Sequence, residues 1–175
     1  MTVSLKYYND KDVYWSPLAA FFKKLGLEPL EVLDNIITIE RQRYEYVEVF
    51  SPSQDLLKIL EIIDADRLYS LGLYVGMMRP GEWFKPSLPL AHKLAPYCNR
   101  MKCIVLDYNG EKFFLYGKTV YEENIVSWNP GVNLVVNELG EALGWGVGKI
   151  ANIGGEQRRV VEPIWDMGWY LRRGG

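Results

Sequence analysis

Glycines followed by cations recur in the second half of the chain, where they could bind phosphate groups. Gly117 and Lys118 follow the apolar run at 113–116, where a helix is expected to end and a strand to begin. Such a junction presents an ammonium group and bare backbone N–H groups, both of which contact nucleic-acid phosphates. A second glycine-rich run occupies residues 143–149. The predicted RNA contacts are six of the cations of this half: Lys118, Lys149, Arg158, Arg159, Arg172 and Arg173.

Each of these glycine elements could instead have a purely structural role. The sequence does not decide between that role and RNA contact. Gly117 fits a left-handed helix C-cap, with Lys118 at the negative end of the helix dipole. A P-loop is excluded because it needs glycine at position 112, where this chain has lysine. The alternate glycines at 144–148 miss the spacing of the dinucleotide fingerprint. On a strand they leave one face bare, which either a helix or an RNA backbone could approach closely.

The paired arginines and the tryptophans raise a similar choice. Gly154-Gly155 predicts a hairpin turn, and Arg158 and Arg159 follow it. Neighbouring strand residues point to opposite faces, so at most one of the two arginines is expected to face a given RNA surface unless a bulge intervenes. The alternative is a solvated hairpin tip. Of the six tryptophans, Trp128 lies in a turn-rich segment and is the one expected to be exposed, whereas buried core rings are the commoner role.

No set of residues suggests catalysis. His92 is the single histidine, and helical spacing places it away from the face shared by Leu90 and Leu94. Cys98 and Cys103 match neither a zinc ribbon nor a redox CxxC motif, and we expect them to be small buried hydrophobic residues. We therefore predict that the protein is not an enzyme and uses no cofactor or metal.

Composition indicates a folded chain. Its 175 residues suffice for one large or two small domains, and 49% of them are hydrophobic. No apolar run approaches the length of a spanning helix, and the start lacks a signal-peptide core, so a soluble cytoplasmic protein is expected. We also expect it to be a monomer. The net charge is −2, but residues 1–97 carry 11 Lys/Arg against 13 Asp/Glu, whereas residues 98–175 carry nine of each. A local positive face on an acidic body follows.

The first half of the chain alternates helices and strands. Ser16-Pro17 predicts a helix start and Gly26 its end, and Ser51-Pro52 predicts the start of a second helix. A third helix is expected over residues 86–96. The expected strands are 36–39, 44–49, with one dry and one wet face, and 68–78. This pattern predicts an α/β domain with a mixed sheet and flanking helices over residues 1–96.

The second half changes character after Pro96. A strand is expected at 103–106, ended by Asn109-Gly110, followed by a helical turn or two over 111–116. Further short strands are predicted over residues 134–136, 144–150, 160–161 and 169–171. Short strands with one helix predict a small β-barrel over residues 97–175. The chain as a whole is therefore expected to be α+β.

Two strings, Leu94 to Tyr97 and Phe114 to Gly117, carry a family resemblance. The second half resembles a PUA domain, a mixed RNA-binding β-barrel found in pseudouridine synthases and archaeosine transglycosylases. With Gly72, Gly76 and Phe84-Lys85 upstream, residues 13–173 resemble the Nip-type factors of large ribosomal subunit biogenesis. Lys118 departs from the eukaryotic members, which have asparagine there, and the acidic opening helix of those members is replaced by residues 14–18.

The resemblance implies a function and partners. It implies an archaeal, non-catalytic factor that acts in ribosome biogenesis and rRNA processing, binding single-stranded pre-rRNA through the PUA domain and protein partners, such as the exosome, through the first domain. It also implies that Asp166, Gly168, Tyr170 and Arg172 belong to the closing strand of the barrel. The alternatives are a targeting subunit of an RNA-modifying enzyme and a protein-interaction adaptor that does not bind RNA.

Overall fold

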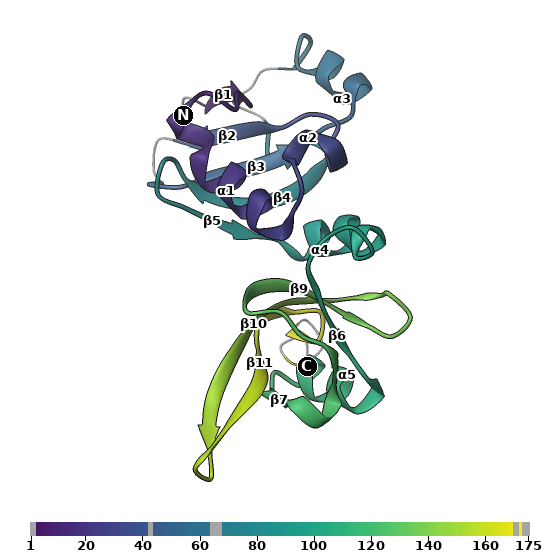
Figure 1. The fold of residues 1–175 in the computed structure, drawn as a ribbon. Helices are drawn as coiled ribbons and strands as arrows, with labels where there is room; N and C mark the ends of the chain where they lie inside the picture. The colour runs from purple at the N-terminus through teal and green to yellow at the C-terminus, as the bar shows by residue number, and fades with distance from the viewer. Residues whose placement is uncertain (1–2, 42–43, 64–67, 170–171, 173–175) are drawn as a thin grey trace. The chain divides into compact units, whose positions relative to one another are not determined.

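The computed structural model of the protein describes residues 3–41, 44–63, 68–169 and 172. The chain divides into two compact units, Met1–Leu90 and Ala91–Gly175 (Figure 1). The predicted boundary between residues 96 and 97 stays a prediction.

The N-terminal unit is built on a five-stranded sheet. Its strands are β1 (Val3–Tyr7), β2 (Ile37–Arg41), β3 (Val47–Ser51), β4 (Leu73–Arg79) and β5 (Trp83–Pro86). They lie side by side in chain order, and each neighbouring pair is antiparallel. The prediction of a mixed sheet in this half is therefore wrong. The connections from β2 to β3 and from β4 to β5 are too short for the crossover that a parallel pair needs.

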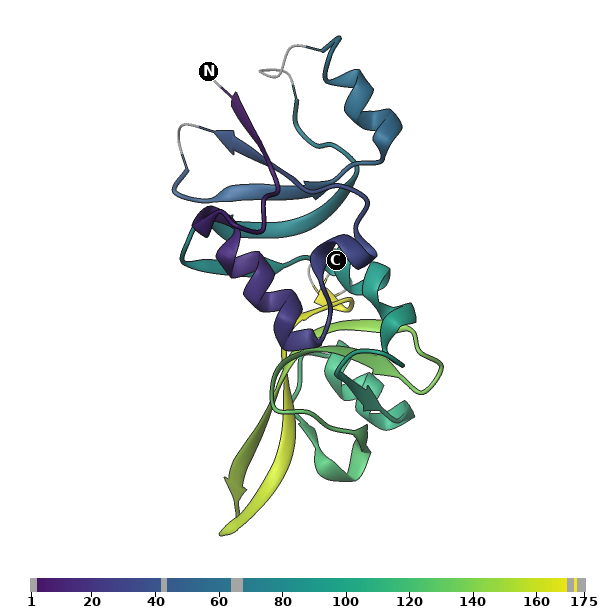
Figure 2. The ribbon, with the colours of Figure 1, turned by 45° about the horizontal axis from the view of Figure 1, so that its top comes forward.

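Helices cover both faces of this sheet. They are η1 (Val13–Trp15), α1 (Ser16–Leu25), α2 (Pro29–Val32) and α3 (Gln54–Ile59). Figure 2 shows α3 on one face of the strands, with α1 and α2 on the other. Successive side chains of β2 point to opposite faces of the sheet and so contact different helices. Thr38 forms a hydrogen bond with Tyr14 of η1, whereas Ile37 and Ile39 pack with the leucines of the α3 segment.

The caps of these helices lie close to, but not at, the predicted residues. Gly26 ends α1 with a left-handed φ of 83°, which confirms the predicted stop. Ser16 is the first residue of α1 and not its N-cap, because η1 runs directly into the helix and Asp12 caps η1 by accepting a hydrogen bond from the N–H of Tyr14. Ser53, two residues after the predicted cap, accepts from the N–H of Leu56 and opens α3.

The C-terminal unit is a curled, mixed sheet with a helix against it. The strands are β6 (Cys103–Leu106), β7 (Val120–Tyr121), β8 (Ile125–Ser127), β9 (Gly131–Asn137), β10 (Ala142–Ile153) and β11 (Glu156–Asp166). Their spatial order is β7-β11-β10-β9-β6-β8, with β6 parallel to β9 and the other pairs antiparallel. The helices of this unit are η3 (Ala95–Tyr97), α5 (Tyr108–Leu115) and η4 (Glu122–Asn124), and α4 (Leu88–Leu94) contains the boundary between the two units.

Helix α5 begins earlier than predicted. Asp107 accepts a hydrogen bond from the N–H of Gly110 at 2.7 Å and caps the helix. Asn109 and Gly110, expected to form a turn, therefore lie inside its first turn. Phe114 then points into the core, where a Cβ on Gly146 would lie 3.0 Å from its ring. The bare face of β10 at this position thus serves helix packing, one of the two interpretations open from the sequence.

The two ends of β11 differ in how well they follow the sequence. The turn before it is the predicted hairpin, with φ values of 63° at Gly154 and 91° at Gly155 (the long two-stranded ribbon in Figure 1). After it, the strand expected over residues 169–171 is wrong at Trp169, whose backbone is helical, as is that of Arg172. The extended run ends at Asp166, and a turn follows at Met167 and Gly168. Position 168 requires glycine, because a side chain there would collide with the carbonyl of Leu115. Tyr170, Leu171 and Arg173 lie outside the described residues.

The cysteines form a disulfide, so the prediction that both are free hydrophobic residues is wrong. Cys98 follows η3 and Cys103 begins β6, which brings their Cα atoms to 5.6 Å, within the range that a disulfide spans. Among the helices described, none combines the length and apolar character needed to cross a membrane.

Candidate nucleic-acid interface

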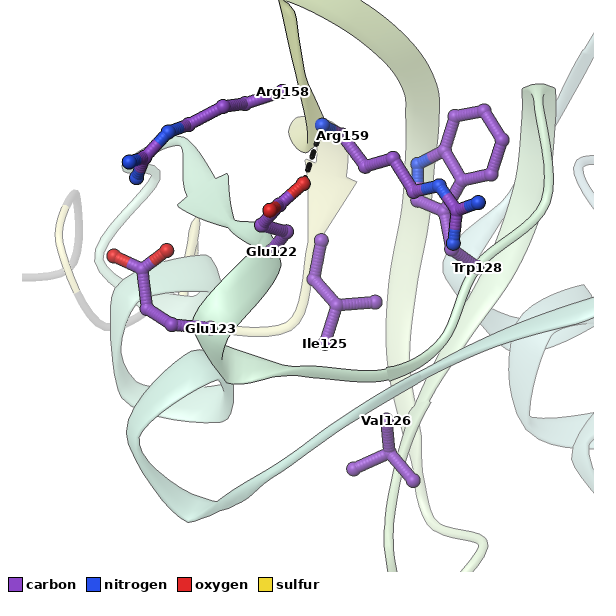
Figure 3. A pocket seen from close by; sticks show the side chains of 7 residues that line it. All are labelled: Glu122, Glu123, Ile125, Val126, Trp128, Arg158 and Arg159. Atoms are coloured by element: carbon purple, nitrogen blue, oxygen red, sulfur yellow. Dashed lines mark hydrogen bonds between the residues drawn. The ribbon is translucent and has the colours of Figure 1, made fainter. Parts of the chain in front are cut away.

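A groove of about 680 Å³ lies beside the base of the β10–β11 hairpin. Its walls come from η4 and β8 on one side and from the start of β11 on the other (Figure 3). The residues that line it are Glu122, Glu123, Ile125, Val126, Trp128, Arg158 and Arg159. The groove therefore combines two guanidinium groups and an indole ring with two carboxylates.

Trp128 is held rigidly in this groove. Its indole Nε1–H donates to the carbonyl of Val160 at 3.2 Å, and the ring packs against the core of the unit. The guanidinium of Arg159 lies over the ring, 5.5 Å from its centroid. The sequence predicted an exposed ring, and the structure shows a half-buried one with a cation on it. A fixed aromatic ring beside a guanidinium is a surface on which an unpaired base could stack.

Glu122 fixes the edge of β11 next to this ring. Its Oε2 accepts a hydrogen bond from the backbone N–H of Arg159 at 3.1 Å, shown by the dashed line in Figure 3. The edge of the strand, and not one of its faces, therefore faces η4. Side chains from both faces flank such an edge, and Arg158 and Arg159 extend in different directions along the groove (Figure 3). Both arginines therefore line one groove, and the expectation that at most one of them faces a given RNA surface stays a prediction.

Two of the predicted cations of the hairpin are paired with carboxylates. Lys149 Nζ lies 2.7 Å from Glu162 Oε1, and Arg158 lies 3.4 Å from Glu156 Oε2. Both pairs are well exposed to solvent, and exposed pairs contribute only about 0–1 kcal/mol. Phosphate groups can therefore replace the carboxylates at little cost.

A second cluster forms at the end of α5. Gly117 has a φ of 71°, its N–H donates to the carbonyl of Phe114, and the N–H of Lys118 donates to that of Phe113. These two bonds form the Schellman motif, so the helix C-cap predicted for Gly117 is confirmed. Lys118 is exposed directly after this cap. RNA contact by its ammonium group stays a prediction.

Arg172 closes this second cluster from the C-terminal segment. It makes a bidentate pair with the buried Asp166, at 2.9 Å for each bond, and donates to the carbonyl of Leu115. The hydrogen bonds to Asp166 raise the pKa of the guanidinium above its ordinary value. Arg172 thus ties the end of β11 to the end of α5, which positions Gly117 and Lys118. Arg173 lies outside the described residues.

The remaining groups considered from the sequence lie apart from both clusters. His92 is exposed on α4. Within the described ranges, no three His, Cys, Asp or Glu side chains are grouped as a metal would require. Sequence reasoning missed the role of Glu122, because a carboxylate that caps a strand edge 37 residues away leaves no local signal.

Comparisons with known proteins agree with this architecture. Residues 102–175 match the family model described as the UPF0113 PUA domain. A UPF0113 protein of Aeropyrum pernix is 50% identical over 109 residues, which are 61% of this chain and 59% of that protein. The match thus spans less than two thirds of the relative's length.

Two solved structures share the fold. A conserved PUA domain protein from Thermoplasma acidophilum has a TM-score of 0.52 at 12% identity, over 94% of this chain and 96% of that chain. A hypothetical protein from Pyrococcus horikoshii has a TM-score of 0.52 at 15% identity, over 96% of this chain and 99% of that chain. Together with the curled mixed sheet, these similarities confirm the predicted α+β fold, in which an N-terminal sheet with flanking helices is followed by a PUA-like barrel.

Proposed function

We propose that the protein binds single-stranded RNA through its C-terminal unit. The observation that carries this proposal is the groove in which Trp128 and Arg159 form a cation–π pair beside Arg158. The guanidinium groups would bind phosphates, and an unpaired base would stack on the guanidinium plane of Arg159, which the indole supports from beneath. Lys118 and Lys149 extend the positive surface, and the PUA match over residues 102–175 supports RNA as the ligand.

The biological role that we infer is a non-catalytic one in assembly of the large ribosomal subunit. It rests on the resemblance of residues 13–173 to the Nip-type biogenesis factors. In this role the C-terminal unit holds pre-rRNA, and the N-terminal unit binds protein partners of assembly or RNA processing, such as the exosome. No step of this role needs bond-making or bond-breaking by the protein.

RNA binding is tested with the full chain. Ultraviolet crosslinking to single-stranded RNA, followed by mass spectrometry of the peptides, should give crosslinks at the Trp128 segment. The double variant Arg158→Ala/Arg159→Ala should weaken binding and lose these crosslinks. The matched control is Lys23→Ala/Lys24→Ala, which removes two exposed cations from α1. Crosslinks confined to residues 1–90, or equal losses in both variants, would contradict the proposal.

The biological role is tested in cells. Purification of the tagged protein with its bound RNA should enrich precursors of the large-subunit rRNA over those of the small subunit. Equal recovery of both precursors argues against the assembly role. Incubation of the pure protein with ribosomal RNA and S-adenosylmethionine, ATP with magnesium, or neither should leave nucleosides and fragment lengths unchanged. New modified nucleosides or specific ends would instead favour an RNA-modifying enzyme.

A further inference from the structure

The N-terminal sheet carries a tyrosine-lined cleft on the face that α3 covers. Near α3 this face is apolar, with Ile37, Ile39 and Phe50 packed under Leu68 and the leucines of the helix. Further along β2 and β3, a cleft of about 330 Å³ opens on the same face. We call this the tyrosine cleft, lined by Ile39, Arg41, Tyr44, Tyr46, Glu48 and Tyr69.

The tyrosine rings present aromatic surface to solvent. Tyr44 and Tyr46 stack on each other, with ring centroids 5.1 Å apart and planes inclined by 30°. Tyr69 lies on the segment after α3 and is 79% exposed, and Tyr44 is 54% exposed. Tyr46 is half-buried. Since exposed rings gain little from folding, the exposure of Tyr44 and Tyr69 around one cleft is better explained by a ligand than by stability.

Arg41 is held in a fixed position in the cleft. Its guanidinium donates to the carbonyls of Leu68 and Tyr69 at 3.3 and 3.1 Å and lies 3.6 Å from the carboxylate of Glu48. It also lies over the ring of Tyr69, 5.4 Å from the centroid. Among the described residues that line the cleft, Arg41 is the one cation and Glu48 the one carboxylate, and the two balance each other. The guanidinium plane of Arg41 adds to the aromatic surface.

These features select the chemistry of the ligand. A ligand cation would compete with Arg41 for the face of Tyr69, and a phosphate would meet Glu48 beside the paired guanidinium. A neutral, flat ligand stacks on the rings and on the guanidinium plane without either penalty. The phenol groups and Glu48 offer hydrogen bonds to the polar edge of such a ligand. The volume is at the lower end of small-molecule sites, which run from about 300 to 1,000 Å³.

We propose that the tyrosine cleft binds an unpaired nucleobase of single-stranded RNA. This inference rests on the proposed RNA binding, and it adds a second site whose contribution is stacking and not charge. The two sites should therefore respond differently to salt. Loss of stacking at the cleft should leave the slope of log affinity against log salt unchanged. Loss of the groove cations should reduce the magnitude of that slope.

The first test uses the full chain and a fluorescein-labelled oligoadenylate of about a dozen nucleotides, a length within the site sizes of single-strand binders. Tyr69→Ala should weaken binding about 5- to 150-fold, the range for loss of one base–aromatic stack, at an unchanged slope of log affinity against log salt. Tyr69→Phe keeps the ring and should bind like the wild type. An abasic oligomer with the same phosphates should bind wild type and Tyr69→Ala equally. Equal affinity of wild type and Tyr69→Ala for oligoadenylate would overturn the inference.

A second measurement separates this inference from the proposed function. Free adenosine, added to the full chain and followed by NMR, should shift the ring protons of Tyr69 and Tyr44. In Tyr69→Ala the ring protons of Tyr44 should shift less than in the wild type. The indole N–H of Trp128 reports on the groove in the same spectra. If oligoadenylate shifts the ring protons of Tyr69 and Tyr44 but leaves the indole N–H of Trp128 unshifted, the groove is refuted and the cleft is supported. If it shifts the indole N–H alone, the groove is supported and the cleft is refuted. Saturable shifts at Tyr69 with a proline-rich peptide but none with adenosine would refute the nucleobase assignment.

Discussion

The salt dependence of RNA binding gives the sharpest check on the groove. Among the predicted cations that the structure describes, Arg172 is held by the buried Asp166. The other four are Lys118, Lys149, Arg158 and Arg159, whose side chains are exposed or half-exposed. Each phosphate neutralised on a single strand contributes about −0.7 to the slope of log affinity against log salt. Four contacts therefore give a slope of about −3, and raising salt fourfold should weaken binding on the order of 50-fold.

The ion pairs of the hairpin determine the smallest magnitude that this slope should have. Lys149 and Arg158 already have carboxylate partners, at 2.7 and 3.4 Å. If both kept these partners when RNA binds, Lys118 and Arg159 would remain, and the slope would be about −1.4. The same fourfold change in salt would then weaken binding only about sevenfold. The measured slope thus reports whether phosphates replace the carboxylates.

A double variant tests which cations contribute. Lys118→Ala/Arg159→Ala should reduce the magnitude of the slope by about 1.4, and Lys23→Ala/Lys24→Ala should leave it unchanged. The assay is fluorescence anisotropy of a labelled single-stranded RNA at four or more salt concentrations, with folding checked by circular dichroism. A wild-type slope near zero, or an equal change in both variants, would refute the argument that these side chains bind phosphates.

Three further predictions concern the fold. Gly146→Ala should destabilise the protein by about 1–3 kcal/mol in urea unfolding, since its Cβ would crowd the ring of Phe114. Replacing Cys98 and Cys103 by serine should cost about 2 kcal/mol, the chain entropy of a loop this short, and a reductant should have the same effect on the wild type. Burial raises the pKa of Tyr74 from 10.0 to about 12, so its stabilising effect is complete below pH 10 and is lost as pH rises toward 12. Urea unfolding across this range should show a smaller decline in Tyr74→Phe.

Features formed within a few residues could be predicted from the sequence. The Schellman cap at Gly117 needs one residue with positive φ and two bonds to the preceding turn. The hairpin turn at Gly154-Gly155 likewise depends on two adjacent residues. The start of α3 was predicted two residues too early. Ser51 and Ser53 both precede this helix, and only the hydrogen bond from the N–H of Leu56 identifies Ser53 as its N-cap.

Features that depend on pairing between distant segments could not be predicted in this way. The direction of the strands in the N-terminal sheet follows from which strands become neighbours, and the sequence pattern indicates where strands occur but not how they pair. The disulfide depends on where η3 ends and β6 begins, which places Cys98 and Cys103 side by side. Spacing alone did not distinguish this pair from two separate buried thiols.

The two candidate sites illustrate the same limit. Alternation predicted one wet face for the strand over residues 44–49, but the strand begins at Val47, and Tyr44 and Tyr46 precede it as a stacked pair. Tyr69 reaches the cleft because Arg41 bonds to the backbone at residues 68 and 69, and Arg158 reaches the groove because Glu122 fixes the edge of β11. In both sites a polar side chain bonded to a distant backbone group gathers the aromatic and cationic residues. The residue types could therefore be identified from the sequence, whereas their grouping into one surface required the fold.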